Sequence, residues 1–187
     1  MTKRIIKVGF DLDGVLLYNP TRVARPVIAK IKKLIGRDLN KFYYPKSRFE
    51  KFFWYLVHKS SLFPAEGVEK IQVLIKSKKI KVYVISARYE LFKNDFDSWI
   101  KQVDPNKNFS GYFFNDVNDQ PQIFKEKMIR KLDLDVFVED NWDIVSHLNT
   151  RLKHRGLKIF WIYNLFDKKI KYRYKFPSLL KALDNLL

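Results

Sequence analysis

Short apolar runs alternate with longer stretches of helical periodicity along most of this chain. The runs are rich in β-branched and aromatic residues and too short to be helices of ordinary length, so they predict buried strands. They span residues 5–10, 81–86, 111–115, 135–139 and 156–163. Apolar strands that alternate with helices are typical of a parallel sheet covered on both faces. The sequence therefore predicts an α/β fold, a three-layer Rossmann-like sandwich around a five-stranded parallel sheet.

Apolar residues at helical spacing mark the connections between these runs. Pro121 fits the first turn of one such helix, because no backbone hydrogen-bond donor is needed there. The predicted helices span residues 68–75, 90–103, 121–132 and 142–152, with a last helix that begins at Pro177.

Residues 21–63 lie outside this alternation. A helical period ends at Gly36, a common stop signal, and aromatic and basic residues then intermingle to the end of the segment. We expect a small helical cap here, inserted into a core domain of residues 1–20 and 64–187. Most of its rings would pack the cap, while a few could hold a base and its phosphate by stacking and charge. The candidates are Tyr43, Tyr44, Arg48 and Arg22 or Arg25.

Two of the predicted strands end in pairs of acidic residues. Asp11 and Asp13 follow the first strand, with Gly14 directly after them, and Glu139 and Asp140 end the fourth. The carboxyl ends of parallel strands meet at one edge of a sheet, where ligands gather. Like charges at this spacing raise each other's pKa unless a cation intervenes, and hard oxygen ligands suit Mg²⁺. The pattern therefore indicates a magnesium site.

The first acidic pair allows other interpretations. An EF-hand calcium loop that began at Asp11 would need a glycine and a final glutamate at positions that Leu16 and Arg22 occupy, so this loop is excluded. A turn with two solvated acids remains an alternative for the pair taken alone.

The segment Asp11-Leu12-Asp13-Gly14-Val15 resembles the first signature of the haloacid dehalogenase (HAD) superfamily. Its usual members are Mg²⁺-dependent phosphohydrolases that work through an aspartyl-phosphate. Ser86 resembles the second signature, a Ser or Thr that closes the second core strand, and Glu139-Asp140 resembles the fourth, an acidic pair. The third is a lysine on the helix before that pair. The family spacing selects Lys125, with Lys127 as the alternative.

This resemblance implies a role for each matching residue. Asp11 would be the nucleophile, and Asp13 the acid and base that serves the leaving oxygen and then the water. Substrate phosphate would be bound by Ser86, Ala87, Arg88 and Lys125. Mg²⁺ would be held by Asp11, the backbone carbonyl of Asp13, Asp140 and Glu139, the last directly or through water.

The chain of 187 residues has a formal charge of +17 and no cysteine. The charge favours anionic substrates, but lysines scattered over a solvated surface explain it better than a nucleic-acid partner does, so nucleic acid is a partner that we do not favour. The missing cysteines exclude disulfides, thiolate nucleophiles and Cys-ligated zinc. We find no signal segment or membrane span and expect a cytoplasmic enzyme.

The substrate remains open in the sequence. Spacing of the motifs is somewhat similar to that of deoxyribonucleotidase-type members of the superfamily, so a nucleoside monophosphate is the first expectation. Sugar phosphates and phosphorylated nucleic-acid ends are alternatives. A nucleic-acid-binding protein on the same fold, without turnover, is the alternative from another functional class.

Overall fold

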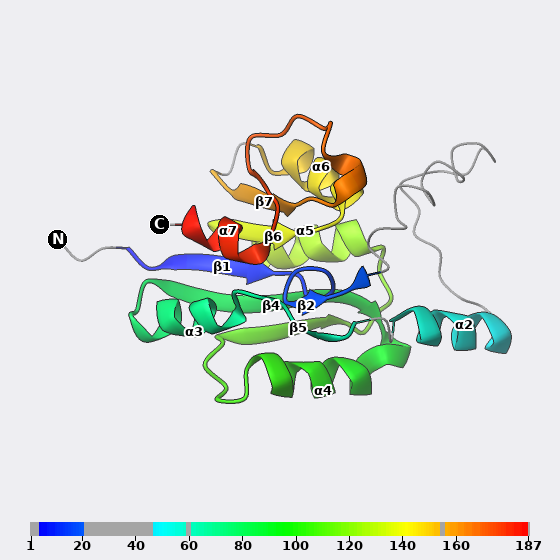
Figure 1. Ribbon diagram of the computed structural model, residues 1–187. Helices are drawn as coiled ribbons and strands as arrows, with labels where there is room; N and C mark the ends of the chain where they lie inside the picture. The colour runs from blue at the N-terminus through cyan, green and yellow to red at the C-terminus, as the bar shows by residue number, and fades with distance from the viewer. Residues whose placement is uncertain (1–3, 21–46, 59–60, 154–155, 187) are drawn as a thin grey trace.

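The computed structural model describes residues 4–20, 47–58, 61–153 and 156–186, and its centre is one parallel sheet (Figure 1). The strand order is β5-β4-β1-β6-β7-β8, and every neighbouring pair is parallel. The strands are β1 (Ile6–Phe10), β4 (Ile80–Tyr89), β5 (Gly111–Asn115), β6 (Val136–Glu139), β7 (Lys158–Ile162) and β8 (Lys175–Phe176). The predicted α/β sandwich is confirmed, and β1 lies in the middle of the sheet, between β4 and β6, with its apolar side chains buried in one core cluster.

The prediction of five strands is wrong by one, because the sheet has six. The backbone amides of Trp161 and Tyr163 donate to the carbonyls of Tyr174 and Phe176, at 2.8 and 3.0 Å, and so add β8 to the edge of the sheet. Its two residues show no apolar period of their own. A strand this short forms because β7 offers it unpaired backbone groups, which no local pattern reveals.

Lys175 binds the backbone of the loop that leads to this last strand. Its ammonium donates to the carbonyl oxygens of Asp167, Lys168 and Ile170, at 3.2, 2.5 and 2.9 Å. It also lies 4.6 Å from the centre of the Tyr163 ring. The basic segment after β7 thus includes one lysine whose charge is used inside the fold.

Helices cover both faces of the sheet and divide the core into two clusters of buried side chains. On one face, β1 and β4 pack against α3 (Val68–Lys76), α4 (Lys93–Val103) and α7 (Leu179–Asp184). On the other face lie α5 (Pro121–Leu132) and α6 (Trp142–Arg151). Short 3₁₀ turns precede α4 (η2, Glu90–Phe92) and follow β7 (η4, Leu165–Asp167). Within the described ranges, no helix has the length and apolar character needed to cross a membrane.

The segment after β1 leaves the sheet through a small antiparallel pair, β2 (Leu17–Tyr18) and β3 (Phe63–Pro64). The chain between these strands includes α2 (Arg48–His58), which Figure 1 shows extending away from the sheet. The helix expected before Gly36, and the candidates among residues 22–44, lie outside the described residues. The division into core and cap therefore stays a prediction.

Candidate active site

The two acid-tipped strands lie next to each other. β1 pairs directly with β6, with Phe10 opposite Val138, and the amide of Asp11 donates to the Val138 carbonyl at 3.0 Å. Each of Asp11, Glu139 and Asp140 offers a carboxylate oxygen that lies within 4.8 Å of the others, and all three residues are buried. The register of one strand pair thus assembles an acidic cluster at the carboxyl edge of the sheet.

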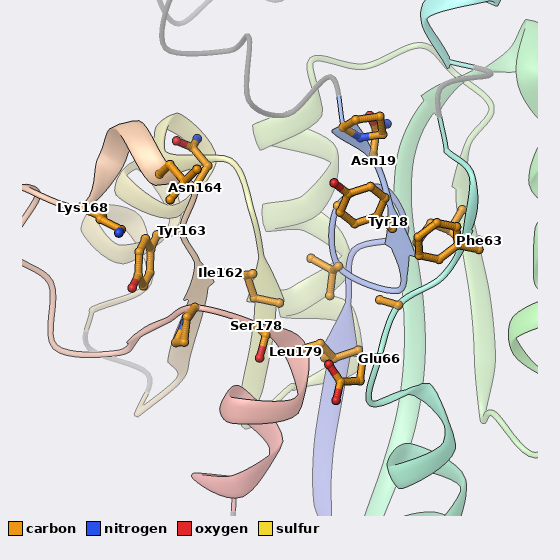
Figure 2. Close-up of a pocket in the computed structure, with 17 residues that line it drawn as sticks. Tyr18, Asn19, Phe63, Glu66, Ile162, Tyr163, Asn164, Lys168, Ser178 and Leu179 are labelled. Atoms are coloured by element: carbon orange, nitrogen blue, oxygen red, sulfur yellow. The ribbon is translucent and has the colours of Figure 1, made fainter.

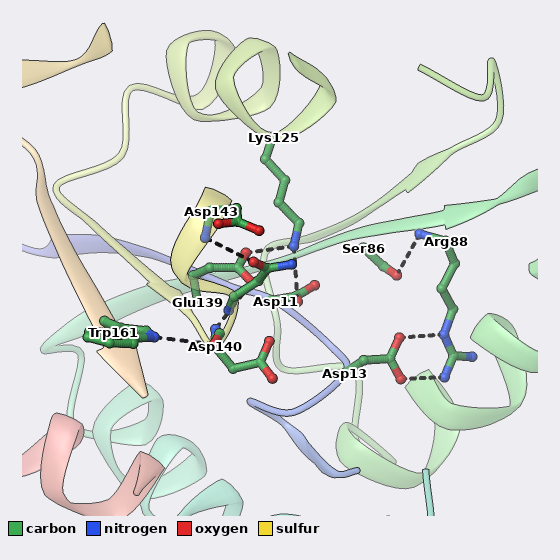
Figure 3. A network of polar contacts seen from close by, with 10 residues as sticks. Asp11, Asp13, Ser86, Arg88, Lys125, Glu139, Asp140, Asp143 and Trp161 are labelled. Atoms are coloured by element: carbon green, nitrogen blue, oxygen red, sulfur yellow. Dashed lines mark hydrogen bonds and ion pairs between the residues drawn. The ribbon is translucent and has the colours of Figure 1, made fainter. Parts of the chain in front are cut away.

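Lys125 supplies a cation to this cluster. Helix α5 begins at Pro121 near the same edge, so the start of its second turn places the lysine over the strand ends (Figure 3). The Lys125 ammonium lies 3.0 Å from Asp11 Oδ2 and 2.6 Å from Glu139 Oε2, and the side chain is 2% exposed. Burial lowers the pKa of Lys125, but the two carboxylates raise it by more, so the lysine stays charged. The alternative, Lys127, is exposed and lines a separate cavity.

The charges in the cluster do not cancel. Burial raises the pKa of Asp11 well above its usual value, and the carboxylates of Glu139 and Asp140 raise it further, although Lys125 opposes them. Burial likewise raises the pKa of Glu139. When ionised, the three carboxylates and the one ammonium carry two net negative charges. An all-oxygen donor set with this charge fits a divalent hard cation such as Mg²⁺.

Gly14 allows the chain to pass close to the cluster. Its φ of +78° lies in the left-handed region, and a Cβ at this position would stand 2.1 Å from Asp140 Oδ2. Only glycine combines this turn with this approach. The space beside Asp140 therefore exists because residue 14 is a glycine and has no Cβ.

Asp13 points away from the cluster, toward Arg88 (Figure 3). Arg88 Nε and Nη2 donate to the two Asp13 oxygens at 2.7 Å each, and Ser61 Oγ donates to Oδ1 at 2.7 Å. The guanidinium also pairs with Asp95 in the first turn of α4. Burial lowers the pKa of Arg88, yet its two aspartate partners raise it by more, so the arginine remains charged.

Ser86 lies in β4, whose hydrogen bonds extend to Tyr89 and do not end at Ser86 as the sequence predicts. The register with β5 shifts between these two residues, and the Arg88 amide donates to Ser86 Oγ at 3.4 Å. This irregularity lets the strand continue while its ladder changes register, which an apolar pattern does not encode. Ser86 is buried and Ala87 is half-buried. The roles of Ser86, Ala87 and Arg88 in binding phosphate stay predictions.

Several supporting contacts were beyond sequence reasoning. Glu139 Oε1 accepts hydrogen bonds from the amides of Asp140 and Asn141, at 3.2 and 3.0 Å, so the carboxylate that faces Lys125 is fixed in place. Trp161 Nε1 donates to the Asp140 carbonyl at 3.2 Å. Asn141 immediately precedes α6 and caps it, a signal that the sequence does offer. Ser61 and Asp95, the further partners of the Asp13 and Arg88 pair, carry no such signal. Ser61 is distant in sequence from Asp13, and Arg88 and Asp95 lie on different elements, so neither pair shares one helical or strand period.

Comparison with known proteins identifies the fold. No protein-family model and no curated protein matches the sequence. Among solved structures, CbbY from Rhodobacter sphaeroides in complex with phosphate is 14% identical with a TM-score of 0.56, over 97% of this chain and 100% of that one.

Two further solved structures agree with this finding. A HAD-superfamily hydrolase from Ehrlichia chaffeensis is 12% identical with a TM-score of 0.53, over 99% of this chain and 97% of that one. The 2-haloacid dehalogenase from Pseudomonas syringae pv. tomato DC3000 is 14% identical with a TM-score of 0.50, over 98% of this chain and 100% of that one. The chain therefore has the fold of HAD-superfamily hydrolases, as its motifs predict.

Proposed function

We propose that this chain, which has the fold of HAD-superfamily hydrolases, is a Mg²⁺-dependent phosphohydrolase that cleaves a phosphate monoester through an aspartyl-phosphate. One observation carries the proposal. Three buried carboxylates gather around a single buried lysine at the carboxyl edge of the sheet, beside a glycine that leaves room for a ligand. Burying so much like charge is costly unless a cation compensates for it.

Asp11 is the proposed nucleophile. Its carboxylate oxygen attacks phosphorus while the bond from phosphorus to the leaving oxygen breaks, which splits hydrolysis into two easier displacements. The Lys125 ammonium, 3.0 Å from Asp11, compensates negative charge on the transferring group, and the Ser86 hydroxyl is a further donor for one of its oxygens. Water then attacks the phosphoryl group, the bond to Asp11 breaks, and the carboxylate returns with release of phosphate.

Asp13 is the proposed acid and base. It gives a proton to the leaving oxygen and later takes one from the attacking water. In the structure its carboxylate accepts two hydrogen bonds from Arg88 and one from Ser61. Asp13 therefore has to release at least one of these bonds to reach the leaving group, and Arg88 sets the position from which it moves.

The metal would be held by Asp11 and Asp140, with the Asp13 backbone carbonyl and Glu139 as further ligands. Both Glu139 oxygens already accept hydrogen bonds, from Lys125 and from backbone amides, which favours an indirect role through water for this residue. When bound, Mg²⁺ supplies positive charge that offsets the carboxylates and the phosphoryl oxygens.

The first candidate substrate is a nucleoside monophosphate, with sugar phosphates and phosphorylated nucleic-acid ends as alternatives. The insert of residues 21–63 would act as the cap that covers the site. Aromatic and basic residues in this insert support a nucleotide, because stacking and charge together hold a base and its phosphate.

Turnover of a panel of phosphate monoesters tests the proposal. We expect activity that needs Mg²⁺, is lost on chelation with EDTA and returns on adding the metal. Asp11→Asn should abolish turnover, whereas Asp116→Asn, which removes an exposed carboxylate after β5, should leave it unchanged. Full Mg²⁺-dependent turnover by Asp11→Asn would refute the mechanism.

A further inference from the structure

A cavity of about 620 Å³ opens beside Gly14, and the proposed chemistry does not use it (Figure 2). It lies between the β2–β3 pair on one side and the segment from β7 to α7 on the other. Gly14 belongs to its lining, and the same glycine stands against Asp140. The cavity and the acidic cluster therefore both border Gly14, although no carboxylate of the cluster lines the cavity.

One wall of this cavity is aromatic. Tyr18 and Phe63 are opposite each other in the β2–β3 pair, and their rings stack with centroids 5.0 Å apart and planes 4° from parallel. The residues remain 45% and 53% exposed. An exposed pair of stacked rings offers a surface on which a planar base can stack, and such stacking accepts any of the bases.

The opposite wall leads into a row of cations. Lys168 lines the cavity, and Lys169, Lys171 and Arg173 follow on the loop that arches away from β7 in Figure 1. All four are exposed, and within the described part of the chain none of them forms an ion pair. The later three cations do not line the cavity, so a mononucleotide confined to it would leave them without an anionic partner. A longer polyanion would, and its phosphates complement their charge.

We propose that the cavity and its basic rim bind the end of a single-stranded nucleic acid, whose terminal phosphate monoester is the substrate. The terminal nucleotide stacks on Phe63 and Tyr18, its phosphate enters the acidic cluster, and the following phosphates run along the loop from Lys168. This inference rests on the proposed function for its chemistry. Binding of the strand, however, is measurable without turnover.

Fluorescence anisotropy with a labelled single-stranded oligonucleotide tests binding in the full-length protein. We expect affinity that falls steeply with salt. The double substitution Lys169→Gln/Lys171→Gln should reduce the slope of log Kd against log salt by about 1.4, because each phosphate contact on a single strand contributes about 0.7. The matched control is Lys76→Gln/Lys101→Gln, which removes two exposed lysines at the C-terminal ends of α3 and α4 and should change nothing.

The aromatic wall has its own test. Phe63→Leu should weaken binding roughly 5- to 150-fold, because it removes one stacking surface. Phe63→Tyr keeps the ring and should restore affinity. Phe63 is half exposed, so neither substitution should change the melting temperature of the protein.

Turnover separates this inference from the proposed function. With 5′- or 3′-phosphorylated oligonucleotides, matching mononucleotides and para-nitrophenyl phosphate as substrates, the oligonucleotide should have the lowest KM, and the lysine substitutions should raise that KM alone. Equal KM values for oligonucleotide and mononucleotide, or an unchanged salt slope, would overturn the inference while leaving the phosphatase intact. Binding to phosphatidylserine vesicles that an oligonucleotide does not displace would also overturn it. Oligonucleotide binding without turnover of any substrate would instead refute the proposed function.

Discussion

Replacing Gly14 by alanine tests whether the proposed metal site depends on the geometry beside Asp140. The new Cβ would stand 2.1 Å from Asp140 Oδ2, whereas real contacts of this kind are no shorter than 3.0 Å. The carboxylate therefore has to move by about 1 Å. Metal–ligand distances tolerate only about 0.2 Å, so Asp140 would leave its place in the cluster.

Two separate magnitudes follow from this substitution. A non-glycine residue in the left-handed region costs about 1–2 kcal/mol, which for a chain of this size corresponds to a melting temperature lower by roughly 2–8 °C. Displacing a ligand or catalytic group by about 1 Å costs on the order of 100-fold in activity. We expect Gly14→Ala to show both losses, with a half-saturating Mg²⁺ concentration at least about 10-fold higher.

Gly156→Ala is the matched control. Gly156 has a φ of +70°, close to that of Gly14, but a Cβ there would meet nothing within 4 Å. It should lower the melting temperature by a similar amount and leave the Mg²⁺ titration of activity unchanged. If both variants melted alike and both kept the wild-type Mg²⁺ dependence, Asp140 would not be a metal ligand and the reasoning would fail.

Three further predictions concern the charged groups around the site. Lys125→Met should lower the free energy of unfolding in metal-free urea titrations by about 3–5 kcal/mol, because its two carboxylate partners stay buried without their cation; an unchanged midpoint would contradict this. Arg88→Lys keeps the charge but not the paired hydrogen bonds to Asp13, so steady-state kinetics should show kcat reduced about 10-fold with KM little changed, and the opposite split would assign Arg88 to substrate binding. Burial raises the pKa of Glu126, but hydrogen bonds from Arg130 and His147 lower it by more. The ionised carboxylate therefore stabilises the fold at pH values above its unfolded pKa near 4.5. In urea titrations at pH 7, the free energy of unfolding of the wild type should therefore exceed that of Glu126→Gln by about 0.5–1 kcal/mol. This difference should disappear as the pH falls below the unfolded pKa of the glutamate. A difference that persists in acid would disprove the ionic origin.

The sequence predicts the architecture well where the signal is local. β5 and α5 lie at the predicted residues, because apolar runs and a proline at the first helical turn are properties of adjacent residues. Adjacency of β1 and β6 was also within reach. Two strands that both end in acids need a shared cation, and the sheet order provides this arrangement.

The parts that sequence reasoning missed depend on pairing across space. β8 has two residues and forms only because the edge of β7 accepts it. The bonds from Arg88 to Asp13 and to Asp95 require β4 to continue past Ser86 and α4 to begin beside it. Neither condition leaves a periodic trace, so Arg88 could be placed near the site but its partners could not be named.

Lys175 gives the basic loop a property that a count of charges does not suggest. The Lys175 ammonium donates hydrogen bonds to three backbone carbonyls, much as a bound potassium ion would be coordinated by them. These bonds restrain the turn between η4 and β8. The exposed cations on this turn are thus arranged before any anion arrives. A ligand that docks there loses little affinity to ordering of the loop, and its association rate should approach that of a rigid surface.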